Sequence, residues 1–223
     1  MKKTILTAIA SMLIAGGAQA EPYDLRGFKL GMTLDEFRAA PYPDEAKYEG
    51  LHVLCSGDAG ADRASGGWEL NVYRPEKKVG VIRCNHFRTD RSISVPRVME
   101  ANMNVAGVGV YQTFEFAPAP GDGALRLFRI SIRSNMQYWD QFWSGYTEKF
   151  GKPSNIKTEK VQNKMGAAFD KMTATWANKE SSITLEQRTS KVDHMGITYL
   201  HHDIGAHVVR QIEAIEGKPS SKL

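Results

Sequence analysis

The residues of this chain that could bind a metal ion are two histidines and an aspartate near its C-terminal end. His194, His202 and Asp203 carry imidazole and carboxylate groups, the ligand types that hold zinc and related metals. His201 and His202 are adjacent, so in a strand they point to opposite faces and do not readily share a metal. One hypothesis is a secreted hydrolase or metal-dependent enzyme that uses His194, His202 and Asp203. The alternative is that one histidine caps the following helix and the other is at the surface, with Asp203 also a candidate N-cap of a helix beginning near Ile204.

Motifs of the common catalytic classes are absent from the sequence. It contains no His-Glu-x-x-His, no Gly-x-Ser-x-Gly and no glycine loop of the kind that cradles phosphate. A nucleophilic enzyme needs a serine or cysteine beside a base, and no spacing in the chain singles out such a pair. We therefore expect a protein without catalytic activity and without a cofactor.

The two cysteines, Cys55 and Cys84, are the next reactive pair. An even number of cysteines in an exported chain indicates a disulfide, and the Cys-x-x-Cys spacing of redox enzymes is missing. The bridge would close a loop of about 30 residues, for which loop-closure entropy predicts about 3.5 kcal/mol of stabilisation. The sequence therefore predicts a structural disulfide.

Basic residues gather in two predicted strands. Arg83 and Arg88 lie in one strand, and Arg129 and Arg133 lie in another. If the sheet aligns them, its open face is cationic and can bind an acidic protein, a lipid headgroup or an anionic polymer through paired hydrogen bonds. These four arginines are the candidate binding residues. The alternative is a solvated sheet face whose charges prevent pairing between sheet edges.

The elements that must position these residues begin with a short helix. Thr33 and Glu36 have the spacing of a capping box and predict a helix that stops before Pro41. Apolar and alternating segments then predict strands over residues 51–55, 68–73, 79–88, 108–116 and 125–133. The last two strands flank a segment rich in proline and glycine, which predicts a hairpin.

Alternation in the strand over residues 125–133 predicts which side chains are buried. Phe128, Ile130 and Ile132 are expected to share the apolar face, and Arg129, Ser131 and Arg133 the polar one.

The second half of the chain begins with a longer predicted helix over residues 136–150, with an aromatic stripe that predicts a core-facing side. A polar, glycine-containing stretch follows over 155–171. Strands are predicted over 174–177, 182–188 and 197–201, and a last amphipathic helix over 204–216.

These elements indicate an α+β fold with antiparallel sheets and helices packed on one face. We expect a single domain over residues 21–216, built from possible half-repeats 21–133 and 134–216, and a frayed tail over 217–223.

The N-terminal segment predicts export. Lys2 and Lys3 precede a short apolar run that ends in Ala18-Gln19-Ala20, the pattern of a signal peptide cleaved after Ala20. We expect the periplasm, where disulfides form, and no transmembrane segment. Removing the two lysines lowers the formal net charge from +4 to +2, so we do not expect nucleic acid as a partner.

Several motifs resemble those of small bacterial envelope proteins. The segment 27–37 contains Leu-Gly-Met-Thr followed by an acidic pair, and residues 148–153 contain Lys-Phe-Gly-Lys-Pro. Both are similar to segments of uncharacterised secreted proteobacterial proteins, with a distant likeness to β-lactamase-inhibitor-like proteins and to lipoproteins of outer-membrane assembly. The chain lacks the lipid-anchor cysteine of those lipoproteins. The resemblance implies a helix-plus-meander fold and a role in binding.

Together these features predict an exported, non-catalytic binding protein of the periplasm. The expected partner is another envelope protein or an anionic polymer, and the sequence does not specify an oligomeric state.

Overall fold

The computed structural model describes residues 21–62, 64, 70–90, 97–162, 165–189 and 191–217. The expected signal peptide over 1–20 and all but the first residue of the expected tail lie outside the described residues. Part of the expected strand over 68–73 lies outside them as well.

A large antiparallel sheet of ten strands dominates the described residues. Its strands are β3 (His52–Cys55), β4 (Ile82–Asp90), β5 (Arg97–Glu100), β6 (Met103–Val105), β7 (Val108–Pro118), β8 (Leu125–Asn135), β9 (Asn155–Gln162), β10 (Ala168–Ala177), β11 (Ser181–Gln187) and β12 (His194–His201). The order across the sheet is β3-β4-β7-β8-β12-β11-β10-β9, with β5 paired with β4 and β6 with β7. The last strand in sequence, β12, therefore returns to the middle of the sheet and pairs with β8.

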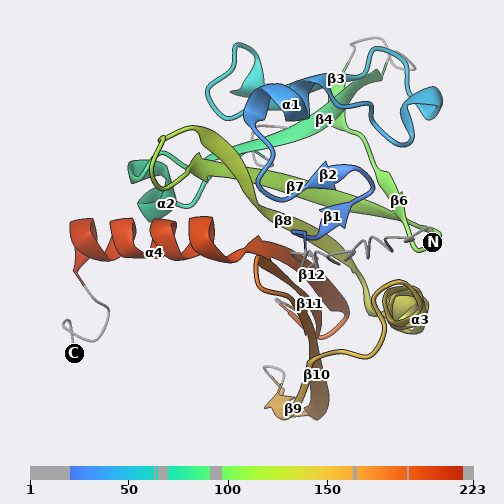
Figure 1. Ribbon diagram of the computed structural model, residues 1–223. Helices are drawn as coiled ribbons and strands as arrows, with labels where there is room; N and C mark the ends of the chain where they lie inside the picture. The colour runs from blue at the N-terminus through green and yellow to red at the C-terminus, as the bar shows by residue number, and fades with distance from the viewer. Residues whose placement is uncertain are drawn as a thin grey trace, which may run out of the picture.

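Helices lie on both faces of this sheet (Figure 1). They are α1 (Leu34–Ala39), α2 (Arg74–Lys78), α3 (Trp139–Phe150) and α4 (His202–Glu216), with 3₁₀ turns at Glu45–Lys47 and Met136–Tyr138. The small hairpin of β1 (Asp24–Leu25) and β2 (Phe28–Lys29) lies on the same face as α3. The α+β class is confirmed. Packing on one face holds for α1 and α3, whereas α4 packs on the other face.

The main core lies between the sheet and the α1/α3 side. Aromatic side chains of the helices, such as Phe37 of α1 and Phe142 of α3, pack against inward side chains of the strands. These include Phe114 of β7 and Tyr199 of β12. A smaller cluster joins α4 to the opposite face, with Ile204 and Val208 packed among the residues Val72, Val81, Ala117, Ala119 and Phe128. A third cluster buries Phe87 of β4 with Ala61, Ala64 and Leu70 on the same outer face. The outer face is therefore covered by α4 in one place and by this cluster in another.

The prediction that Phe128 shares a face with Ile130 and Ile132 is wrong. Ile130 and Ile132 lie in the main core, whereas Phe128 packs with α4 in the smaller cluster. The pairing of β7 with β8 shifts at Glu115/Phe116, so β8 has an extra residue at this point. Such a bulge reverses the alternation of side chains beyond it, and a regular two-residue period cannot anticipate it.

Two other expectations fail where the local pattern is weak. Residues 70–73 are not a strand, and the chain there leads directly into α2. The polar stretch over 155–171 contains the whole of β9 and the start of β10. Within the part of the chain that the structure describes, β9 pairs with β10 alone and most of its residues are exposed, so it lacks the apolar alternation that marks a half-buried strand.

The ends of the helices follow the local sequence in most cases. Thr33 caps α1 in a capping box with Glu36, as predicted. The side chain of Asn135 accepts a hydrogen bond from the backbone N–H of Gln137 at the turn before α3. The expectation that Asp203 caps α4 is wrong, because the helix begins at His202 and Asp203 lies in its first turn, where its charge favours the helix dipole.

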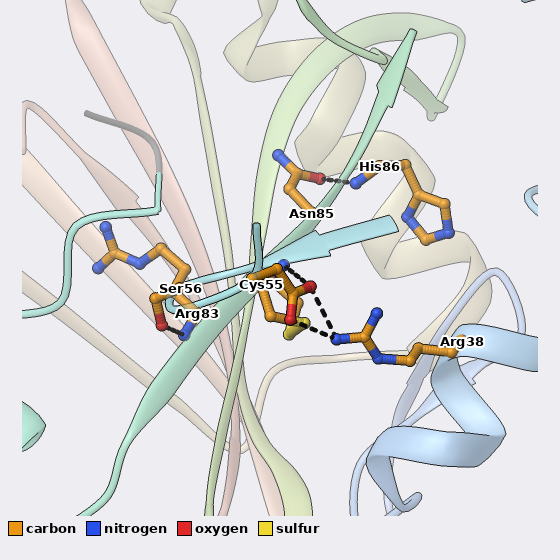
Figure 2. The surroundings of a disulfide bond; sticks show 8 residues. Arg38, Cys55, Ser56, Arg83, Asn85 and His86 are labelled. Carbon is orange, nitrogen blue, oxygen red and sulfur yellow. Dashed lines mark hydrogen bonds and ion pairs between the residues drawn. A yellow bond between two sulfur atoms is a disulfide. The ribbon is translucent and has the colours of Figure 1, made fainter. Parts of the chain in front are cut away.

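The predicted disulfide between Cys55 and Cys84 is present (Figure 2). The two cysteines face each other across β3 and β4 and are 1% and 0% exposed, so the bridge is sealed from solvent. Arg38 of α1 binds Asp58 with an Nη2–Oδ2 distance of 2.8 Å, and Asp58 also accepts the backbone N–H of Cys55. The edge strand β3 is therefore fixed to β4 by the sulfur bridge and to α1 by this ion pair.

His86 is the most deeply buried histidine among the described residues and lies inside an aromatic cluster. Its ring centroid is 4.5 Å from that of Tyr42 and within 5.4 Å of those of Phe28 and Phe37. The side chain is 3% exposed, and its Nδ1 atom has no partner among the described residues. Burial lowers the pKa of His86 from 6.5 to about 4, because the surrounding rings cannot solvate an imidazolium.

We expect His86 to make the protein less stable in mild acid. The folded pKa lies below that of the unfolded chain, so unfolding takes up a proton between pH 6.5 and about 4. The contribution of neutral His86 to the free energy of unfolding is complete above pH 6.5. It decreases by about 3 kcal/mol as the pH falls from 6.5 to about 4. In urea unfolding from pH 7 to pH 4, the loss in free energy of unfolding should be about 3 kcal/mol smaller in His86→Phe than in the wild type. The control is His52→Gln, a change at an exposed histidine, which should show the same loss as the wild type. Equal pH profiles for all three proteins would contradict the assignment of this loss to His86.

No helix among the described residues is long and apolar enough to cross a membrane.

Candidate functional site: the open face of the sheet

The outer face of the sheet, opposite the main core, is the candidate binding surface. Among the described residues it is covered in two places: α2 and α4 pack against each other and over β7, β8 and β12 (Figure 1), and Phe87 of β4 is buried with Ala61, Ala64 and Leu70. Most of the remaining outward positions are polar and alternate with core side chains of the same strands. We call the uncovered part of this surface the open face.

A groove of about 700 Å³ runs over β4, β7, β8 and β12 on the open face. Its floor and walls are polar, with hydroxyl, carboxylate and guanidinium groups. The lining residues are Arg83, Glu100, Tyr111, Gln112, Thr113, Glu115, Arg129, Ser131, Arg133 and Thr198. The groove places Arg129, Ser131 and Arg133 together, as the alternation of β8 predicted.

At one end of the groove, two arginines share one buried carboxylate. The Glu115 side chain is 2% exposed and accepts hydrogen bonds from Arg83, with an Nη2–Oε1 distance of 2.7 Å, and from Nε of Arg129. Arg129 also binds Glu76 of α2 through Nη2 and Oε1, 2.7 Å apart. The network connects three strands to α2 and cancels most of the positive charge of both arginines.

Electrostatics keep this cluster ionised. Burial opposes ionisation of Glu115, but the hydrogen bonds and positive charges of Arg129 and Arg83 outweigh it, so the pKa of this carboxyl is lowered. Burial also disfavours the charge of Arg129, and contacts with Glu115 and Glu76 reverse that effect and raise its pKa. Both groups are charged at neutral pH, and the cluster is a structural clamp at the edge of the groove.

The other end of the groove has the opposite character. Arg133 is exposed and makes no ion pair among the described residues. It and Tyr111 also line an adjoining hollow of about 430 Å³, which includes Tyr138, Lys191 and His194. The rings of Tyr111 and Tyr138 are 52% and 37% exposed, and Lys191 is exposed without an ion pair among the residues that the structure describes. Asp193 offsets part of the charge of Lys191, while Arg133 makes no ion pair in the described part of the chain, so this end combines an available guanidinium with open aromatic surface.

The structure brings together three of the four predicted binding residues. Arg83, Arg129 and Arg133 line the same groove. Arg88 does not join them, because five positions separate it from Arg83 on β4 and place it on the opposite face. Its guanidinium lies over the ring of Tyr48, 5.8 Å from the centroid. Figure 2 shows the same alternation at the bridge, where Arg83 and His86 extend to opposite sides of β4.

The hypothetical metal ligands are not brought together. His194 begins β12, and His202 follows its last residue, so the strand's full length of eight residues separates them. His194 binds Asp193 with an Nδ1–Oδ1 distance of 2.7 Å, and His202 contacts the backbone oxygen of Lys179. Within the described parts of the chain, no three His, Cys, Asp or Glu side chains are grouped to hold a metal.

Sequence reasoning missed Tyr111, Tyr138, Lys191 and Glu115 as residues of this site. Tyr111 and Glu115 occupy outward positions of β7, and their alternation with Val110 and Phe114 is visible in the sequence. Lys191 and Tyr138 reach the hollow from segments outside the strands, and the sequence carries no signal for their proximity to Arg133.

Comparisons with protein-family models, with curated proteins and with solved structures found no significant match to this chain.

Proposed function

We propose that this protein is an exported, non-catalytic binding protein whose open face takes an anionic macromolecule in the periplasm. The observation that carries the proposal is that Arg133 and Lys191, which make no ion pair among the described residues, lie with the exposed Tyr111 and Tyr138 along two adjoining hollows. Surface concavity, aromatic rings and arginine are features typical of binding sites.

The disulfide supports export. Structural disulfides persist in oxidising compartments and are rare in the bacterial cytosol. The buried bridge between Cys55 and Cys84 therefore fits the sequence-based expectation of a signal peptide.

The charge distribution indicates which end of the groove makes the contacts. Glu115 and Glu76 already hold Arg83 and Arg129, and a ligand would have to break these bonds to use them. Arg133 has its five donors available for a carboxylate or phosphate. The proposed contact residues are therefore Arg133, Lys191, Tyr111 and Tyr138.

Charge reversal tests the proposal. Poly-L-glutamate, a polymer of simple carboxylates, should bind the wild type in titration calorimetry, and more weakly as salt is raised. We expect Arg133→Glu combined with Lys191→Glu to weaken binding at least ~10-fold, equal to about 1.4 kcal/mol.

The matched control changes the same charge elsewhere. Lys152 and Lys179 are also lysines without an ion pair among the described residues, and they lie outside both hollows. Lys152→Glu with Lys179→Glu should retain most of the affinity. Equal losses in the two double variants would show that net charge alone drives binding and would overturn the proposed site.

A further inference from the structure

A row of side-chain hydroxyls crosses the open face from strand to strand. In the register of the sheet, Thr113 faces Ser131, Ser131 faces Thr198, Thr198 faces Thr184, and Thr184 faces Thr175. Asn155 of β9 faces Thr175 and ends the row with an amide. We call these six residues the hydroxyl row.

The row lies on the outer face along its whole length. Each of the five hydroxyl residues is next to a core residue of its own strand: Phe114, Ile130, Ile197, Ile183 and Ala174. Asn155 is on this face because it pairs with Thr175. The five hydroxyl residues are half-buried, and none of their side chains has a hydrogen-bond partner among the described residues. The row therefore offers a line of free hydrogen-bond donors and acceptors. Four of its members are threonines, whose β-branched side chains favour strands.

Strand geometry sets the spacing of these groups. Neighbouring strands are about 4.8 Å apart, so six strands place the row over about 24 Å. Its first three members, Thr113, Ser131 and Thr198, form the floor of the groove that Arg133 and Tyr111 also line. The row thus begins beside the free cation and the exposed ring and runs outward across the sheet to the edge strand β9.

This combination favours a sugar polymer over an acidic peptide. A chain of sugars presents hydroxyls at regular intervals along its length, which matches a repeating line of donors and acceptors, directly or through bridging water. The ring of Tyr111 offers an amphipathic surface, and Arg133 can hold a carboxylate with two parallel hydrogen bonds. An acidic peptide could use Arg133 and Lys191, but the backbone groups on one side of an extended peptide recur about every 6.8 Å, which does not match the spacing of about 4.8 Å between strands.

We infer that the ligand of the open face is a linear polysaccharide bearing carboxylates, laid across the strands along the hydroxyl row. This inference rests on the proposed binding function and specifies its ligand class.

Removing hydroxyls without changing shape or charge tests the inference. Thr184→Val with Thr198→Val replaces two hydroxyls in the middle of the row with methyl groups. Polygalacturonate, a linear polymer of sugar carboxylates, should bind the wild type and lose about 10-fold in affinity in this variant, as expected for two hydrogen bonds. Binding of poly-L-glutamate should be unchanged.

The control is Thr158→Val, on the same sheet but on the opposite face. Thr158 pairs with Met172 and alternates with the row position Asn155 on β9. Its replacement should leave the binding of both polymers unchanged, and unaltered thermal unfolding of all variants would show that they are folded.

The wild type alone provides a second measurement. Galacturonate oligomers of increasing length should bind more tightly until they span about 24 Å, and longer chains should gain little. Three results together would overturn the polysaccharide inference: equal binding of both polymers, no change in either affinity in the double threonine variant, and no dependence of affinity on oligomer length. The proposed anion site would still stand. If neither polymer binds, both proposals fail.

Discussion

Replacing Glu115 with glutamine should lower the free energy of unfolding by about 3 kcal/mol at neutral pH. The change keeps the side chain's size and removes the charge that two arginines share. Arg83 and Arg129 are only 23% and 26% exposed, so water cannot fully replace the lost carboxylate. Removing one partner from a buried ion pair is costly because it leaves the other charge uncompensated.

The pH dependence of this loss has a defined sign. The pKa of Glu115 is lowered in the folded protein, so its contribution is complete above 4.5, the usual pKa of a glutamate, and disappears as the pH falls through the folded value. Urea unfolding of wild type and Glu115→Gln should therefore converge in acid.

Glu76→Gln is the matched control for the same cluster. The ion-pair partner of Glu76 among the described residues is Arg129, which retains Glu115, so the expected loss is about 1 kcal/mol. If Glu115→Gln and Glu76→Gln have equal and small effects, the network does not stabilise the groove as described.

Removing the disulfide should have an effect of similar size. Cys55→Ala with Cys84→Ala releases a loop whose ends are 29 positions apart, and the unfolded chain gains the corresponding entropy, about 3.5 kcal/mol. The edge strand β3 pairs only with β4 in the described residues, so it and the segment that follows should be the first to exchange amide hydrogens.

Reduction of the wild type provides the comparison for this variant. A thiol reductant should lower the urea midpoint of the wild type toward that of the double variant and leave the double variant unchanged. Two free thiols in protein recovered from the periplasm, with no response to the reductant, would contradict a structural disulfide.

Local sequence patterns determined the parts of the fold that depend on neighbouring residues. Thr33 and Glu36 specify the start of α1, because a capping box needs only residues three positions apart. The turn between β7 and β8 and the shared face of Arg129, Ser131 and Arg133 follow from turn residues and a two-residue period. Two cysteines in a chain expected to be exported were sufficient to predict the bridge.

Tertiary structure decided the features that depend on pairing between distant segments. The bulge that moves Phe128 to the α4 side depends on how β8 registers with β7. The neutralisation of Arg83 and Arg129 depends on Glu115 and Glu76, which belong to other elements.

The sequence by itself determined an α+β chain with a disulfide, the expected export signal and a polar outer face on the strands. Only the tertiary structure decided which arginine is free and that five hydroxyls form one line, because β12 returns from the end of the chain to pair with β8. A single sequence records alternation within each strand, but the alignment between strands is set by packing of the whole core.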